Sequence, residues 1–335
     1  MSTNPFYVGT KAEDCQQFFG RVAEVGRIVE SLATLTTVSI IGETQIGSSS
    51  LLSYIAQRGW EKHPIAETET DHWTQILTDY DLHSFDMALF PDTKHFFTAM
   101  LNTLGTTGHT AHDLISALKA RQRKVVFFLD EFDATVNNPN FTADFFDGLR
   151  SVANTSTTAL VVATKTSIPQ LVSDGKIKTN SISPFDNLIG VTIQLGPLPD
   201  NEAYDLLKGL AALGGYTLTT EELEFIVKEG KGYPRRLRQL GRIVIEKRQQ
   251  GQKPAKFAEV KKQFAQEMQY RKPRRKIPWQ PIITITASIV LSLIALFIYL
   301  DITKREWTTG NFILPIVVGL ATNWIYDLWR KSQKS

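Results

Sequence analysis

Short apolar runs that alternate with helix-like segments constrain the fold of this chain more than any other feature. The clearest runs lie within Thr36–Ile41, Lys124–Asp133 and Thr158–Ser167, and Val191–Leu195 is a shorter one. Parallel strands that are covered on both faces read as continuously apolar, whereas strands with one solvated face alternate. The sequence therefore predicts an α/β domain with a parallel sheet and right-handed crossovers.

A loop with two glycines follows the first predicted strand. Gly42 and Gly47 are spaced as in the nucleotide-binding pattern G-x-x-x-x-G-K-[ST], and a helix is predicted to begin at Ser48. The main-chain N–H groups of such a loop and of the next helix's N-terminus form a cradle for phosphate. We expect Ser48, Ser49 and Ser50 to line this site, with the Ser49 hydroxyl on Mg²⁺. Ser48 stands where the pattern has the lysine that reaches the β- and γ-phosphates.

Two acidic residues end the second apolar run. Asp130 and Glu131 follow the residues VVFFL, and ligands of open α/β sheets bind beyond the carboxyl ends of the strands. We expect Asp130 to hold the Mg²⁺ shell and Glu131 to orient or deprotonate an attacking water. The alternative is that the two acids only mark a solvated strand end.

The order of several short segments resembles the AAA-like, STAND-type P-loop NTPases, a prokaryotic branch of the AAA+ and related ATPases. The resemblance covers about residues 4–245. It implies a five-stranded parallel core with a helical lid, ATP or ADP with Mg²⁺ as the ligand, and a role as a nucleotide-gated switch or oligomerising signal ATPase. The segments that carry it are NPFYVG, FFGRVAEVGRI, the glycine loop, FFLDEFD, ATKTS, SPFDN, IQLGPLPDNEA and GKGYPRRL.

The resemblance also implies roles for residues outside the loop and the acids. Phe19, Gly20 and Arg21 match the segment that packs near the adenine, so Arg21 is a candidate nucleotide-binding residue. Thr164 and Lys165 occupy the sensor position after the third apolar run, where relatives often have arginine. The lid motif of the family corresponds to residues 232–234, which makes Pro234 and the adjacent Arg235 candidates as well.

The serine in place of the loop lysine leaves three interpretations open. The loop binds nucleotide through main-chain N–H groups and Mg²⁺, and hydrolysis is slow. Alternatively, the missing charge comes from Lys165, from a neighbouring subunit's arginine, or from Arg235, Arg236 or Arg238 on the lid. In the third interpretation the pocket is vacant and the domain is a scaffold. A lost positive charge at the transferred phosphoryl group commonly costs about a hundredfold or more in rate.

The C-terminal part of the chain predicts a membrane anchor. Ile282–Leu300 carries no charge over 19 residues, close to the roughly 20 that cross a bilayer's hydrocarbon core. Asn311–Trp329 is less pure and reads as a second span, a re-entrant segment or an interfacial helix, of which we favour the second span. Basic residues in 271–276 and 330–334 flank the pair, which places both ends on the cytoplasmic side. The prediction is a multi-pass protein of the inner (cytoplasmic) membrane, with its soluble domain in the cytoplasm and its basic cluster near lipid headgroups.

The single cysteine and a pair of histidines give two weaker indications. One cysteine, Cys15, is consistent with a reducing compartment, and the N-terminus shows no secretory pattern. His109, His112 and Asp113 have helix-like spacing for a metal, but a polar loop that caps a helix is the simpler interpretation.

The predicted organisation of the chain has five parts. They are a P-loop NTPase α/β core (1–196), a helical lid (197–250), a basic juxtamembrane helix or linker (251–276), two transmembrane helices (277–329) and a cytoplasmic tail (330–335).

The leading functional hypothesis is a membrane-anchored, nucleotide-binding switch with weak or no ATP hydrolysis. We expect it to form homo-oligomers and to act on a protein partner that the sequence does not identify. One alternative is an inactive P-loop scaffold that recruits partners to the membrane. Another is a membrane-tethered DNA-binding ATPase, which we disfavour because the net charge of +3 is small and the arginines after Pro234 suit a lid. We therefore do not expect nucleic acid as a partner.

Overall fold

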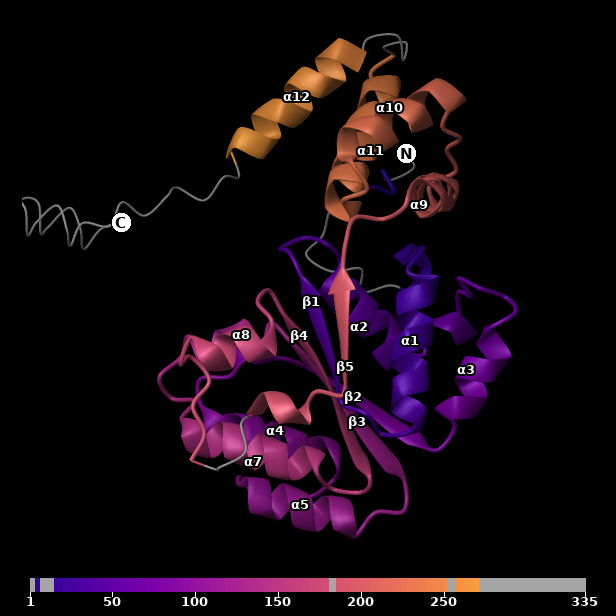
Figure 1. Cartoon of the computed structure of the whole chain (residues 1–335). Coiled ribbons are helices and arrows are strands. Elements are labelled where there is room, and N and C mark those ends of the chain that lie inside the picture. Colours follow the sequence, from indigo (N-terminus) through magenta and orange to yellow (C-terminus); the bar gives the residue numbers. More distant parts are fainter. Residues whose placement is uncertain (1–3, 7–14, 181–184, 252–256, 271–335) are drawn as a thin grey trace, which may run out of the picture. The chain divides into compact units, whose positions relative to one another are not determined.

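The computed structural model describes residues 4–6, 15–180, 185–251 and 257–270. Its centre is a five-stranded sheet in the order β2-β3-β4-β1-β5 (Figure 1). All four strand pairings are parallel, which confirms the predicted α/β class. The strands are β1 (Val38–Gly42), β2 (Tyr80–Asp86), β3 (Lys124–Asp130), β4 (Thr158–Thr164) and β5 (Val191–Leu195).

The inner strands explain why continuous apolar runs predicted this sheet. β4 is buried at every position, and β3 at every position after Lys124. Their side chains alternate between two cores: Val126 and Phe128 face one, whereas Phe127 and Leu129 face the other. The edge strand β2 has exposed and half-buried residues instead, and its mixed sequence was not predicted as a strand.

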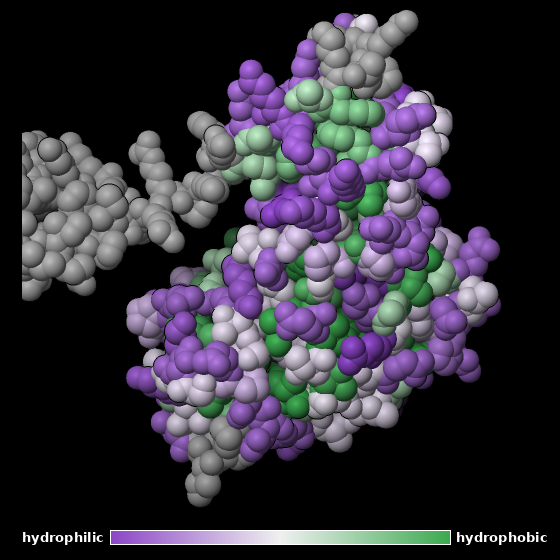
Figure 2. Space-filling model, turned by 45° about the horizontal axis from the view of Figure 1, so that its top comes forward, coloured by the Kyte–Doolittle hydropathy of each residue, from purple (hydrophilic) through white to green (hydrophobic). Residues whose placement is uncertain are grey.

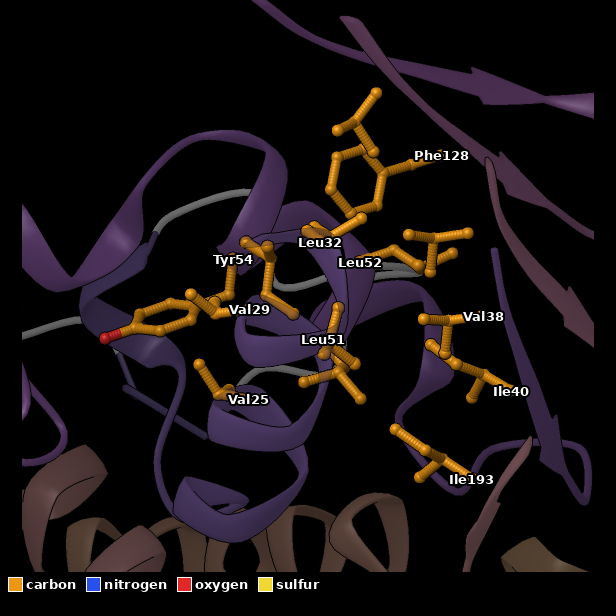
Figure 3. Packing of buried hydrophobic residues seen from close by; sticks show 14 of the residues in the cluster. Val25, Val29, Leu32, Val38, Ile40, Leu51, Leu52, Tyr54, Phe128 and Ile193 are labelled. Carbon is orange, nitrogen blue, oxygen red and sulfur yellow. The ribbon is translucent and has the colours of Figure 1, made fainter. Parts of the chain in front are cut away.

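Helices cover both faces of the sheet (Figure 1). On one face lie α1 (Val22–Ala33), α2 (Ser48–Ala56) and α3 (Thr70–Ile76). Figure 3 shows that Leu32 of α1 and Leu51 of α2 belong to the same apolar cluster as the strand residues Phe128, Val38 and Ile193. On the other lie α4 (Thr93–Thr103), α5 (Ala111–Lys119), α7 (Ala143–Ala153) and α8 (Ile168–Ser173), with the one-turn α6 (Asp133–Val136) after β3. Short 3₁₀ turns complete the connections: η1 (Cys15–Gln17), η2 (Gly59–Glu61), η3 (Met87–Leu89) and η4 (Phe185–Leu188).

Local capping fixes where two of the helices begin. Thr110 accepts the N–H of Asp113, and the Asp113 carboxylate accepts the N–H of Thr110, so α5 begins with a capping box. α10 (Thr220–Gly230) begins in the same way, with Thr219 as the cap and Glu222 as its partner. From the sequence alone, Thr220 before Glu221 is the predicted N-cap, and the structure places the cap one residue earlier.

A second layer of helices follows β5. α9 (Asp200–Leu213), α10 and α11 (Pro234–Gln249) enclose an apolar core of their own, which Phe6 also enters. Glu222, fully buried on α10, forms an ion pair with Arg248 on α11. We call α9–α11 the lid helices. Pro234 is the first residue of α11, a position where the missing N–H of proline costs nothing because the first N–H groups of a helix have no acceptor within it.

The last described helix, α12 (Phe257–Tyr270), packs beside α10 and α11. Glu267 accepts hydrogen bonds from Arg242 at 2.7 and 2.8 Å and from Gln239 at 2.5 Å, and Phe257 stacks on Phe225. The basic cluster 271–276 and the two apolar segments predicted to span a membrane lie outside the described residues. Among the helices that are described, none combines the length and the apolarity that crossing a bilayer requires.

Most large apolar side chains lie in the three cores. On the face shown in Figure 2, hydrophilic side chains cover most of the area, with smaller hydrophobic groups between them. Leu89 and Leu213, at 76% and 49% exposure, are the large hydrophobic side chains that stand out in the described residues.

Candidate functional site

A cavity of about 230 Å³ lies where β1, β3 and β4 end and α11 begins. The candidate catalytic and nucleotide-binding residues line it, apart from Arg21; Phe19, Gly20 and Arg236, which the sequence also offered, do not. Five lining residues, Glu43, Thr44, Gln45, Asp133 and Ala163, were not predicted. The predicted ones are Gly42, Gly47, Ser48, Ser49, Ser50, Asp130, Glu131, Thr164, Lys165, Pro234 and Arg235.

The glycine loop is tightly folded between β1 and α2. A Cβ on Gly42 would lie 2.6 Å from the Ile46 side chain, and Gly47 has φ 104°, a conformation that L residues rarely adopt. Ile46 is 1% exposed and anchors the loop in the core. The first N–H groups of α2 have no partner within the helix, so the loop presents main-chain donors to the cavity.

The two acids at the end of β3 also line the cavity. Asp130 is 4% exposed, and its Oδ1 accepts the N–H of Glu131 at 2.9 Å. Glu131 has φ 51°, which is uncommon for a residue with a side chain and marks a constrained turn. The turn leaves the Glu131 side chain 42% exposed at the cavity, while Asp130 stays buried below it.

Lys165 connects the acids to the end of β4. Its ammonium lies 2.8 Å from a carboxylate oxygen of Glu131, and its backbone N–H donates to Asp133 Oδ2 at 2.8 Å. The hydrogen bond to Glu131 raises the pKa of Lys165 above its ordinary 10.5, so the side chain is a cation at any physiological pH. A neutral pair therefore occupies the sheet side of the cavity.

Thr164 adds an unused polar group. The residue is 5% exposed, and its hydroxyl is buried without a hydrogen-bond partner among the described residues. An orphan hydroxyl of this kind is unusual in a protein interior. Because Thr164 lines the cavity, a ligand oxygen or a water there would satisfy the hydroxyl.

The lid contributes the other positive charges. Arg235 and Arg238 both line the cavity from α11. Burial lowers the pKa of Arg238; its Nη2 donates to Gln17 Oε1 at 2.5 Å, while its Nε is buried without a partner within the described part of the chain. Arg236 points elsewhere, with its guanidinium 4.4 Å from the centre of the Tyr233 ring. Two of the three lid arginines weighed from the sequence thus face the cavity.

A smaller cavity of about 50 Å³ adjoins the first, and Gly47, Ser50, Pro234 and Arg238 line both. Its remaining walls are mostly apolar: Phe18, Phe19, Ile46, Leu198 and Leu206, together with Gln17 and Arg21. The two cavities form a polar chamber followed by an apolar slot. This arrangement suits a ligand with a charged end and a flat, less polar end.

Arg21 lies in the wall of the slot, but its hydrogen bonds go to protein groups. Nη2 donates to the carbonyl oxygens of Ile46 and Gly196, and Nη1 donates to Glu24. Its backbone N–H donates to Glu202 on α9. The side chain is 5% exposed, so Arg21 holds the loop, the end of β5 and the lid together. Its predicted contact with nucleotide stays a prediction.

Comparison with known proteins bears on this arrangement. The family model described as Novel STAND NTPase 2 matches residues 40–217. No curated protein matches the chain.

Three solved structures share the fold. The ORC1 protein of Aeropyrum pernix, solved in complex with DNA, is 16% identical to this chain. The alignment covers 91% of this chain and 77% of the ORC1 chain, with a TM-score of 0.52. The ORC2 protein of the same organism, solved as ADPNP–ADP complexes, is 16% identical over 92% of this chain and 80% of its own, with a TM-score of 0.52. A Walker-type ATPase of Pyrococcus abyssi is 14% identical over 94% of this chain and 92% of the ATPase chain, with a TM-score of 0.51. At these identities the likeness concerns the fold alone.

Proposed function

The chain belongs to the Novel STAND NTPase 2 family, and on that premise we propose that it binds ATP or ADP with Mg²⁺ as a membrane-anchored switch that hydrolyses ATP slowly or not at all. Its fold is that of a nucleotide-binding P-loop NTPase. One observation carries the proposal: a glycine loop, a pair of acids, a sensor position and lid arginines from four separate elements line the same cavity.

The donor set of the cavity suits Mg²⁺. Asp130 supplies a buried carboxylate and Ser49 a hydroxyl, both on the cavity wall. Mg²⁺ is commonly held by one or two protein oxygens, substrate phosphates and waters, so a dedicated protein cage is not required. When bound, the ion neutralises charge on the β- and γ-phosphates.

The residues around the γ-phosphate position define what hydrolysis would need. Glu131 would accept a proton from water as the water oxygen attacks the γ-phosphorus, and the bond from that phosphorus to the leaving oxygen of ADP would break. The Thr164 hydroxyl would donate to a phosphate oxygen or to the water. Ser48 brings no charge to this place, and the turnover we expect is slow for that reason.

The apolar slot is the proposed place for the base. Phe19 and Leu206 provide flat and aliphatic walls there, and Arg238 lies between slot and chamber. A nucleotide bound this way touches the loop on the sheet and α11 on the lid together. Its arrival would therefore fix the lid against the sheet, which is the physical basis of a switch.

Membrane anchoring, cytoplasmic location and self-association are part of the proposal. The uncharged run Ile282–Leu300 and its basic flanks support the anchor. The resemblance to signal ATPases supports homo-oligomers, which would cluster the C-terminal segments of several copies. The placement of Arg235 and Arg238 on the cavity favours a nucleotide over a nucleic acid as their ligand.

Binding of a fluorescent ATP analogue to the full-length chain in detergent, with and without Mg²⁺, tests the function. We expect binding that strengthens with Mg²⁺, and Asp130→Ala should remove most of that gain. Asp174→Ala, at an exposed position outside the cavity, is the matched control. Absence of binding by the unchanged protein at millimolar nucleotide would end the proposal.

The same assay separates the switch from the inactive scaffold. Ser48→Lys restores the loop pattern, so an intact site should gain measurable ATP hydrolysis. A variant that neither binds nor hydrolyses ATP would favour the scaffold.

A further inference from the structure

Lys165 occupies a central place at the carboxyl edge of the sheet. It directly follows Thr164, the last residue of β4, and Thr164 pairs with Ile41 of β1. β4 lies between β1, which leads into the glycine loop, and β3, which ends at Asp130. Lys165 is therefore adjacent both to the loop that lacks its lysine and to the acids.

The side chain is held but remains accessible. The Lys165 side chain is 46% exposed. Within the described residues its ammonium forms one ion pair, with the carboxylate of Glu131, which is 42% exposed. Its backbone is fixed separately, through the N–H bond to Asp133. Pairs this exposed are worth little in water and exchange partners readily. The ammonium can thus move while its Cα stays in place.

The other cations of the cavity are placed differently. Arg235 and Arg238 belong to α11, and Arg238 is engaged with Gln17. They reach a ligand only while the lid lies against the sheet. Lys165 shares the rigid sheet with the glycine loop, as the lysine of a complete loop does.

We propose that Lys165 supplies the phosphate-binding ammonium that the loop lacks at Ser48, and that Glu131 holds this ammonium until a nucleoside triphosphate takes it. The inference rests on the proposed function, since it concerns how the same cavity recognises its ligand. The Glu131–Lys165 pair then has two states. In one, the two groups neutralise each other; in the other, Lys165 is on phosphate and Glu131 is released to face the water.

This exchange couples recognition to chemistry. A diphosphate leaves the γ-phosphate position empty, so it competes less well with Glu131 for the ammonium. The protein would then distinguish ATP from ADP through Lys165, without a loop lysine. Removing the Glu131 charge should strengthen ATP binding, because the ammonium no longer has to leave an ion pair.

The test measures the affinities of ATP and ADP analogues for the full-length chain with Mg²⁺. Lys165→Met should weaken ATP binding by about tenfold or more, the effect of losing a hydrogen bond to a charged group, and ADP binding less. Lys176→Met is the matched control, because Lys176 is exposed and lies outside the cavity. Thermal unfolding of each variant verifies that it is folded.

A double-mutant cycle makes the test specific. Ser48→Lys should restore ATP binding strongly in the Lys165→Met background and add little to the ATP affinity of the unchanged protein, since one ammonium suffices for binding. Glu131→Gln should strengthen ATP binding only when Lys165 is present.

The outcomes are separable from those of the proposed function. Failure of the unchanged protein and of Lys176→Met to bind any nucleotide rejects the function itself. Normal binding by the unchanged protein, with equal ATP affinities for Lys165→Met and Lys176→Met, overturns the role of Lys165. If Lys165→Met does not fold, Glu131→Gln decides: unchanged or weaker ATP binding contradicts the inference.

Discussion

Arg21 Nη2 donates to the carbonyl oxygen of Gly196 at 2.6 Å, although the two residues are 175 positions apart in the chain. The same atom donates to Ile46 in the glycine loop at 3.2 Å. Gly196 follows β5, where the chain leaves the sheet for the lid helices. One buried guanidinium therefore links the two segments that would have to move together when a nucleotide binds.

Arg21→Met should destabilise the protein by about 2–4 kcal/mol, because two carbonyl oxygens lose their donor in a buried place. Nucleotide affinity should also fall, since the loop loses its link to the lid. Urea unfolding and analogue binding measure the two effects. Arg27→Met, on the exposed side of the same helix, is the control. A variant as stable as the control would show that these hydrogen bonds contribute nothing.

Gly47→Ala should weaken nucleotide binding through the loop backbone. A residue with a side chain at φ 104° costs roughly 1–2 kcal/mol, and the loop can relieve that strain only by turning its N–H groups away. Gly175→Ala is matched, because Gly175 has φ 66° with open space around it and lies outside the cavity. We expect similar losses of stability from both and a loss of nucleotide binding from Gly47→Ala alone, measured by unfolding and by titration with the analogue.

Arg248→Met should cost about 3–5 kcal/mol of unfolding free energy, since it leaves the fully buried carboxylate of Glu222 without its partner. Adding Glu222→Gln should recover part of the loss, because the unpaired charge is gone while the cap of α10 remains. Chemical denaturation of the two single variants and the double variant gives the coupling. Lys228→Met, exposed on α10, should stay near the parent protein; purely additive effects would contradict the pairing.

The free energy of unfolding should decrease as the pH is lowered from about 7 to about 5, because of His83. Burial lowers the pKa of His83 below its ordinary 6.5. The charge of Asp81 raises this pKa again in part, whereas the charge of Arg121 lowers it further. The Nε2 atom of His83 is buried and has no hydrogen-bond partner in the described residues. As the pH falls, the unfolded chain binds this proton first, so the stability declines until the folded pKa is passed.

His83→Phe should flatten this part of the pH profile, measured by urea unfolding at several pH values. At pH 8 neither state binds the proton, so the difference between variant and parent there gives the packing effect alone. An unchanged slope between pH 7 and pH 5 would show that other groups cause the decline.

The inner part of the sheet could be predicted from the sequence because burial on both faces leaves a continuous apolar run. β2 could not, since an edge strand such as Tyr80–Asp86 has polar side chains on its open side. Its existence followed only from the family resemblance. The start of α10 was displaced by one residue because Thr219 and Thr220 are both good caps, and only the backbone distinguishes them.

The site was predicted best where a residue type has one use. Glycines five apart and a pair of acids after a strand meet in space as expected. Asp133 was missed because its carboxylate accepts the backbone N–H of Lys165, which lies 32 positions further along the chain, just after the neighbouring strand β4. Arg21 lies near the predicted place, but nothing in its neighbours along the chain indicates that its guanidinium binds Ile46 and Gly196.

α11 has one more consequence. Its N-terminal part borders the cavity at Pro234 and Arg238, while Gln239 and Arg242 donate hydrogen bonds to Glu267 on α12. Sixteen residues of unbroken helix make a rod about 24 Å long. A helix of this kind moves as a rigid body. A shift of Arg238 toward a bound phosphate would therefore also move Gln239 and Arg242, and with them α12, the helix that precedes the two apolar segments in the sequence.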